Sequence, residues 1–421
     1  EISFGQQAFF GIGAYAGGMT TAMAGWPLAA GLLCGALAGA AAAAFVGAVA
    51  VRLYGIAFAV ASLAFAETMR IALELFRWQV TVAGEAVGPL GVEGFRGIRA
   101  VFDAQMSEGA YLALVGGCLG LTLLAFGALE RSRYGVILRQ VGADATLAAH
   151  GGVPVVAVRL MAITASGALA GLGGAFYAHQ LTYVEPRNFD MMLGVHSLAY
   201  GLIGGLGTVF GPILGVIIDI GLVEASRLFG GWRMVVFGGL VALILIWRPR
   251  GLLDENTVRW LTRAAKRTEE RPMIQRSASL AALLVCLGAT AVAAQAPNRT
   301  KAAIACQPAK EGKFTYDCVV TLSRAQKGDP IAGAEVVVGA DMPSMPMAHN
   351  VKPVAATAGE KPGEYRVRLA LEMYGDWAVH VTVGGPVRDK VVEVLNFTPT
   401  TVAAATARKA PATPGHTKHH H

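Results

Sequence analysis

The sequence predicts a mostly α-helical, polytopic membrane region followed by a small all-β sandwich of the immunoglobulin type. Of the 421 residues, 54% are hydrophobic and 15% are charged, whereas an ordinary soluble domain has about 25% charged residues. The 53 glycines are nearly double the usual share of about 7%. Near the C-terminus, long apolar runs give way to alternation with period two, which is typical of half-buried strands. The five cysteines are too few for a disulfide scaffold.

Apolar runs long enough to cross about 30 Å of hydrocarbon recur through the first 250 residues. The sixth and seventh runs are short and broken by glycines, and broken segments are tolerated in a membrane only where protein or water satisfies the backbone. Glycines at four-residue spacing, such as Gly13/Gly17 and Gly31/Gly35/Gly39, predict closely packed helices. We expect eight spans, near residues 5–25, 28–51, 54–76, 110–129, 155–178, 191–206, 210–226 and 232–248.

The distribution of basic residues predicts the orientation of these spans. Arginines concentrate in the loop 130–153 and in the basic linker 253–272, which we therefore expect on the cytoplasmic side. The loop 77–109 then faces outward. The net charge of +7 is divided between two dissimilar halves, and we expect no nucleic-acid partner.

The junction between the halves, residues 273–296, resembles a secretory signal peptide. Met273 opens a short positive start, an apolar run follows to Val292, and small residues flank a possible cleavage site. The alternative is an ordinary ninth membrane helix. Lys266 is the only lysine before this junction, which favours two fused modules. Either interpretation places residues 297–421 across the membrane.

The inside loop from Glu130 to Pro154 is too polar to span the membrane but has helical spacing. It predicts a short amphipathic helix that docks in a groove of a partner, or else a passive surface helix. The chain has no phosphate-binding Gly-x-x-x-x-Gly-Lys-Ser/Thr motif. Any use of ATP must therefore come from a partner.

Polar residues within the predicted spans are candidates for lining a solute path, because ionisable groups in a membrane are costly and often functional. Glu67 and Glu74 are seven residues apart and share one helix face. Structural pairing is the alternative for each candidate, and His196 fits a satisfied core histidine equally well. The full set is Glu67, Glu74, His196, Asp219 and Glu224.

Several ordered motifs resemble the LivM-type permease of branched-chain amino acid ABC importers. They are Ser3-Phe-Gly-Gln-Gln-Ala-Phe-Phe-Gly, Leu53-Tyr-Gly-Ile-Ala-Phe, Arg131-Ser-Arg-Tyr-Gly, Gly204-Gly-Leu-Gly-Thr-Val-Phe-Gly-Pro and Arg248-Pro-Arg-Gly-Leu. The resemblance covers about residues 1–252 and implies a pore subunit in the bacterial inner membrane without a cofactor of its own. It also implies further N-terminal membrane sequence ahead of Glu1, so we expect this chain to be an N-terminally incomplete permease.

The same resemblance implies partners and a coupling segment. The partners are a LivH-like permease, two cytoplasmic ATPase subunits and a periplasmic amino-acid-binding protein. The segment with Arg139, Gly142, Asp144 and Gly151 would be the coupling helix seated on an ATPase. The transported solute would be a branched-chain amino acid or a related small polar molecule.

Residues 297–397 alternate as strands do, for example through Tyr365, Val367 and Leu369, with turn signals between the runs. About 100 residues of short strands fit a small immunoglobulin-like sandwich. The tail 398–421 is rich in Ala, Pro and Thr and ends in histidines. We expect it to be disordered, with weak metal binding or simple solvation of the histidines as alternatives.

One loop of the exported half has a chemical signal for copper. Met342, Met345, Met347 and His349 fall within eight positions, and soft thioether ligands suit Cu(I). Plain packing and partner contact are the alternatives. Cys306 and Cys318 are the cysteines of the exported part, and we expect a disulfide, with metal ligation as the alternative.

Residues 310–397 resemble the YtkA-like/FixH-like periplasmic sandwich family, which suggests metal handling. The sequence thus predicts an importer permease fused to an exported sandwich. The alternative is a membrane-anchored copper-handling protein whose helical part is not an active permease. We find no paired carboxylates, nucleophile triad or metal-helix motif at useful spacing, and we expect no enzyme.

Overall fold

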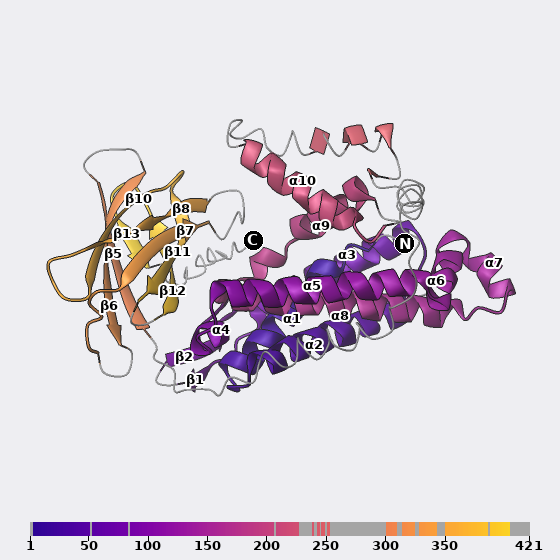
Figure 1. Ribbon diagram of the computed structural model, residues 1–421, viewed down its shortest axis with the longest axis horizontal. Coiled ribbons are helices and arrows are strands. Elements are labelled where there is room, and N and C mark those ends of the chain that lie inside the picture. The colour runs from indigo at the N-terminus through magenta and orange to yellow at the C-terminus, as the bar shows by residue number, and fades with distance from the viewer. Residues whose placement is uncertain are drawn as a thin grey trace, which may run out of the picture.

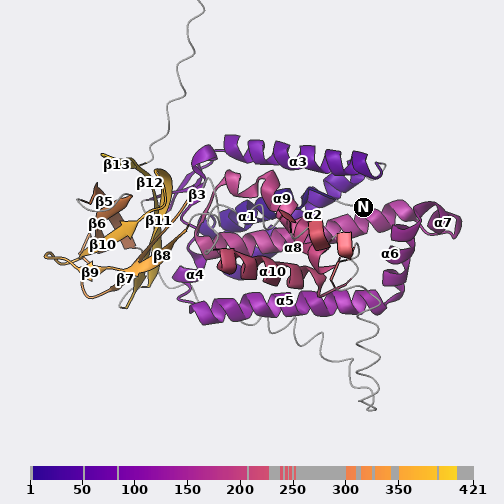
Figure 2. The same ribbon diagram turned by 90° about the horizontal axis from the view of Figure 1, so that it is seen from above.

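The structure, a computed structural model, consists of a helical body and a β-sandwich (Figure 1). The sandwich lies at one end of the helical body, and α6 and α7 lie at the opposite end in both views (Figures 1 and 2). The residues described are 3–50, 53–82, 85–205, 208–226, 300–309, 314–324, 328–342, 350–385 and 388–404, with short pieces of 238–252.

The helices α1, α2 and α8 form the centre of the helical body. The helices α3 and α5 run along opposite sides of this centre (Figure 2). Among the described residues, four helices are long and apolar enough to cross a membrane, namely α2, α3, α5 and α8, and they match the second to fifth predicted spans. The helices α1, α9 and α10 are shorter, and most of the eighth predicted span lies outside the described residues. The bounds are α1 Gln6–Ala22, α2 Leu28–Ala50, α3 Ile56–Leu75, α5 Glu108–Arg131, α8 Val155–Leu181, α9 Met191–Gly204 and α10 Gly211–Ser226.

Glycines bring α1, α2 and α8 into backbone contact. A Cβ atom built on Gly13 of α1 would lie 2.2 Å from the carbonyl oxygen of Gly171 in α8. One built on Gly171 would lie 2.3 Å from the carbonyl oxygen of Gly35 in α2, and one on Gly39 would lie 2.4 Å from that of Gly167. The predicted close packing of glycine-bearing helices is therefore confirmed, and glycine at these three positions is a steric requirement.

A four-stranded antiparallel sheet covers the end of the bundle nearest the sandwich. The sequence pattern predicted only an outward loop over 77–109, whereas the structure pairs strands from that loop with a strand that follows α8. Phe95 and Ile98 are fully buried beneath it against Tyr15 and Phe189. We call residues 77–107 and 182–190 the cap. Its elements are β1 Val80–Val82, β2 Glu85–Pro89, η1 Gly91–Glu93, β3 Phe95–Arg96, α4 Ala100–Asp103, β4 Tyr183–Val184 and η2 Pro186–Phe189.

The sandwich consists of two antiparallel sheets with strand orders β5-β6-β10-β9 and β13-β12-β11-β7-β8. Alternate residues of β10 are buried, as the period of two predicted, and Trp377, Tyr316 and Phe397 fill the space between the sheets. The bounds are β5 Thr300–Pro308, β6 Thr315–Arg324, β7 Glu335–Asp341, β8 Asn350–Ala355, β9 Thr357–Ala358, β10 Glu364–Ala370, β11 Gly375–Gly384, β12 Asp389–Phe397 and β13 Val402–Ala404.

Several sequence-based predictions fall outside the described residues. The basic linker 253–272, the signal-like segment 273–296 and the end of the tail from 405 onward are among them. So are Met345, Met347 and His349. These remain predictions.

Candidate functional site

The polar loop expected to form one amphipathic helix forms two, α6 (Arg133–Ala143) and α7 (Ala145–His150). Asp144 separates them because its carboxylate accepts hydrogen bonds from the backbone N–H groups of Thr146 at 2.8 Å and Leu147 at 3.0 Å. An aspartate in this position caps the start of a helix. Asp144 therefore fixes the bend between α6 and α7, which together form a helical hairpin.

The other residues of the predicted coupling segment lie on the same hairpin. Arg139 is exposed and donates to the backbone oxygen of Glu130 at 3.1 Å. Gly142 has open space around its α-carbon, and Gly151 ends α7. The hairpin thus brings the four predicted residues Arg139, Gly142, Asp144 and Gly151 to one end of the molecule.

The hairpin buries one apolar face and exposes another. Val141 and Ala148 pack against Val158 at the start of α8. Leu147, by contrast, is 71% exposed and Tyr134 is 64% exposed. Exposed apolar side chains rimmed by polar ones mark a surface that contacts another protein or a membrane.

A cavity of about 510 Å³ opens beside this hairpin, between the ends of α1, α3, α6 and α8. Gln6 donates to the hydroxyl of Ser166 at 3.0 Å on its wall. The guanidinium of Arg159 lies 4.5 Å from the centre of the Tyr54 ring, in the geometry of a cation–π contact. A cavity with a few convergent polar groups suits a small polar solute.

Two of the predicted path residues are held by an arginine between them. Glu67 and Glu74 both form ion pairs with Arg70, on the same face of α3. The spacings of three and four residues make such pairing the expected geometry in a helix. The side chain of Glu67 is 46% exposed and that of Glu74 is 24% exposed. Their positions agree with the structural alternative as well as with a role in a path.

The remaining path candidates belong to the two short helices. Asp219 in α10 is buried and accepts a hydrogen bond from the hydroxyl of Tyr200 in α9 at 2.9 Å. The ring nitrogen Nδ1 of His196 lies 2.9 Å from the backbone oxygen of Met192. Glu224 falls in α10, but its side chain lies outside the described residues. The α9–α10 pair therefore contains a buried acid within the predicted broken region.

The buried polar side chains of His179 and Gln7 in the bundle were not predicted as site residues from the sequence. His179 of α8 is fully buried, and its Nε2 lies 2.9 Å from the Thr21 hydroxyl of α1. Gln7 of α1 is 3% exposed, and its Oε1 has no hydrogen-bond partner among the described residues. A Cβ on Gly194 of α9 would lie 2.4 Å from that oxygen. The Gln6-Gln7 pair at the start of an apolar helix was the available signal for Gln7.

In the sandwich, the sulfur atoms of Cys306 and Cys318 lie 2.03 Å apart in a disulfide between β5 and β6. Met342 is buried in the core between the sheets, where its Cε lies 2.8 Å from the position of a Cβ on Gly375. This arrangement matches the packing alternative for Met342. Among the described residues, no group of three or more His, Cys, Asp and Glu side chains is placed to hold a metal.

Together, the fold and these sites define a polytopic helical membrane protein with an appended β-sandwich. Residues 1–246 match the family described as the permease component of the branched-chain amino acid transport system, and the chain belongs to this family. Residues 294–382 match the YtkA-like family. Both resemblances found in the sequence are thus confirmed, although no solved structure matches the chain significantly.

Curated relatives cover the helical part. The high-affinity branched-chain amino acid permease LivM of Salmonella typhimurium is 28% identical over 272 residues, which are 60% of this chain and 63% of the relative. LivM of Escherichia coli is 38% identical over 96 residues, 23% of each chain. The nucleoside ABC transporter permease NupC of Lactococcus lactis is 32% identical over 143 residues, 34% of this chain and 40% of the relative. The chain thus spans less than two thirds of the length of these relatives.

Proposed function

We propose that the helical part is a pore subunit of an ATP-driven importer for branched-chain amino acids or related small polar solutes. Its membership of the permease family makes it a transport subunit of an ABC system. The relatives named for branched-chain amino acids and for nucleosides show that solute identity varies among similar permeases. Branched-chain amino acids are favoured because they are named by the family and by three of the relatives.

The observation that carries this proposal is the α6–α7 hairpin beside the cavity. The hairpin presents Leu147 and Tyr134 to a partner, while Val141 and Gly142 also line the wall of the cavity. A partner that moves the hairpin would therefore change the shape of the cavity directly. This geometry supports coupling of ATP hydrolysis in a separate ATPase to access for the solute.

The coupling proposal is tested by co-purification of the membrane protein with its ATPase subunits. Leu147→Glu places a charge at the most exposed apolar position of α7, so we expect loss of the associated ATPase. The matched control is Gln105→Glu, which adds a charge in the cap at the other end of the bundle and should leave the association intact. Equal retention of the ATPase by both variants would refute the coupling role. Uptake of labelled leucine, valine and a nucleoside by cells expressing the complete transporter then tests the solute and the direction.

We further propose that the sandwich is exported and that its Met-rich loop binds Cu(I). The sandwich lies at the end of the bundle opposite the hairpin (Figure 1), which supports an outward location. Because Met342 is buried in the core, the proposal depends on Met345, Met347 and His349. Replacing Met345 and Met347 by leucine should abolish Cu(I) binding by the full chain, whereas Met342→Leu, the control, should leave it unchanged. Unchanged affinity in the double variant would exclude this loop.

A further inference from the structure

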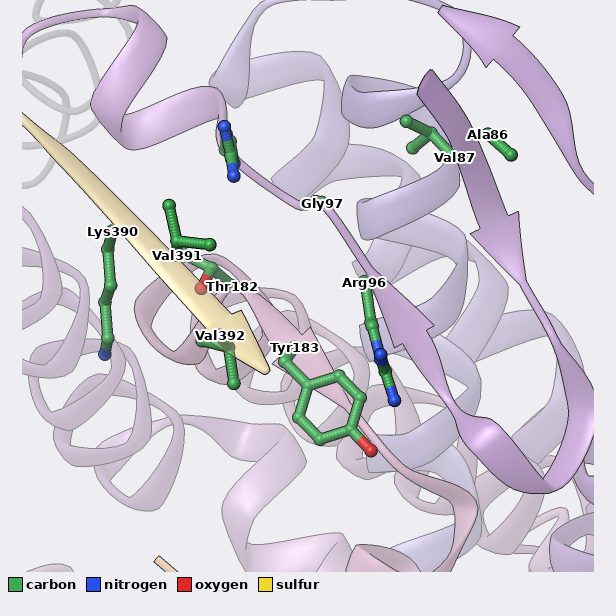
Figure 3. A pocket seen from close by; sticks show the side chains of 10 residues that line it. Ala86, Val87, Arg96, Gly97, Thr182, Tyr183, Lys390, Val391 and Val392 are labelled. Carbon is green, nitrogen blue, oxygen red and sulfur yellow. The ribbon is translucent and has the colours of Figure 1, made fainter. Parts of the chain in front are cut away.

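The sandwich rests on the cap through the outer face of its five-stranded sheet. Tyr183 of β4 packs with Ala378 of β11 and Val394 of β12, and Val392 packs beside them. Tyr183, Ala378 and Val394 are all less than one-tenth exposed. Figure 3 shows β12 crossing over Thr182 and Tyr183 with Val392 directed toward the tyrosine ring. This part of the contact is therefore apolar and buried.

A buried ion pair joins the two parts next to this apolar centre. The guanidinium of Arg99 lies 3.3 Å from the carboxylate of Asp389, and their side chains are 11% and 4% exposed. The same carboxylate accepts hydrogen bonds from the backbone N–H groups of Thr300 at 2.7 Å and Lys390 at 2.8 Å. Asp389 thus has two backbone donors within the sandwich and its charge partner, Arg99, in the cap. A buried charge without its partner is strongly unfavourable.

The edge of the contact is polar. Arg388 lies 3.6 Å from Glu108, whose side chain is 81% exposed. A small pocket of about 120 Å³ remains between the two parts, lined in part by Arg96, Arg99 and Lys390, as Figure 3 shows. An apolar centre with a polar rim is the usual organisation of a specific protein–protein interface, and the buried Arg99–Asp389 pair adds a charge contact to it.

We infer that the outward cap is a binding surface for the sandwich, and that this binding persists after the covalent link between them is cut. Arg99 and Asp389 are 290 residues apart in the chain. If the sandwich were held only by the covalent chain, the cap and the sandwich would not need complementary charges buried where they meet. The sandwich is thus a bound module of the permease, whether the segment 273–296 is processed or retained. Association of the sandwich with the cap does not depend on transport.

The test uses the full chain with a site for a sequence-specific protease inserted between residues 253 and 299. After cleavage in detergent, gel filtration over a dilution series measures how much sandwich remains with the membrane part. We expect association at micromolar concentration. Arg99→Gln should raise the dissociation constant by about 30-fold, because truncating one partner of a buried hydrogen-bonded charge pair is costly.

Two controls separate this pair from general effects. Arg388→Gln, at the adjacent position on the rim, removes an ion pair whose partner Glu108 is 81% exposed, and it should change the dissociation constant less than about threefold. Asp389→Asn keeps an oxygen for the Thr300 N–H group. The double variant Arg99→Gln/Asp389→Asn should raise the dissociation constant little more than either single change does. Release of the wild-type sandwich at once on cleavage, or equal weakening by the Arg99 and Arg388 variants, would overturn the inference.

Discussion

Replacing Gly171 by alanine is the sharpest test of how the bundle is held together. The new Cβ would lie 2.3 Å from the carbonyl oxygen of Gly35, whereas real Cβ contacts are essentially never below 3.0 Å. The helices α2 and α8 must therefore separate locally by at least 0.7 Å, the difference between these two distances. The obstacle is backbone on a helix, so no side chain can rotate away to relieve it.

Overpacking of this kind typically lowers the free energy of unfolding by about 1–3 kcal/mol, and by more when the backbone must move. We expect Gly171→Ala to lower the thermal unfolding midpoint in detergent by about 5 °C or more. The matched control is Gly120→Ala in α5, where a Cβ would meet nothing within 4 Å. That change should stabilise the helix by up to about 1 kcal/mol, the difference in propensity between glycine and alanine. Effects of the same sign and size in both variants would refute the steric argument.

Three further predictions concern single interactions. Thr21→Val removes the hydroxyl at the ring nitrogen of buried His179 and should destabilise the bundle by about 1–3 kcal/mol. Thr21→Ser keeps the hydroxyl and should retain the thermal midpoint, whereas an unchanged midpoint in Thr21→Val would contradict a stabilising role for this hydrogen bond. Burial raises the pKa of Glu185 above its ordinary 4.5, so its contribution to stability is present below pH 4.5 and is lost as the pH rises through the raised value. Glu185→Gln should therefore flatten the dependence of the thermal midpoint on pH above 4.5, and an unchanged slope would exclude this carboxyl. Replacing Cys306 and Cys318 by alanine opens a loop closed over a separation of 12 residues and should destabilise the sandwich by about 3 kcal/mol. The temperature at which a protease begins to cleave the sandwich should therefore fall. An unchanged cleavage temperature would show that the disulfide contributes no stability.

Part of the candidate site was predictable because its signals are local. The helical spacing of 130–153 predicted that Arg139 and Asp144 lie on one segment, and the structure has them on one hairpin. The pairing of Glu67 and Glu74 with Arg70 follows from spacing within a single helix. The hydrogen bond between Tyr200 and Asp219 could not be predicted from spacing, because it depends on how α9 and α10 pack against each other.

The sequence by itself determined the long apolar helices and the alternating strands of the sandwich. A run of apolar residues specifies a membrane helix and strict alternation specifies a half-buried strand, since each pattern is read within a few neighbouring residues. Only the tertiary structure decided which elements meet. The cap needed β3 to pair with β4 across more than 80 residues, and Arg99 needed Asp389 from the other module. Periodicity shows which face of an element is buried but not what covers it, because the covering partner is chosen by shape and charge far along the chain.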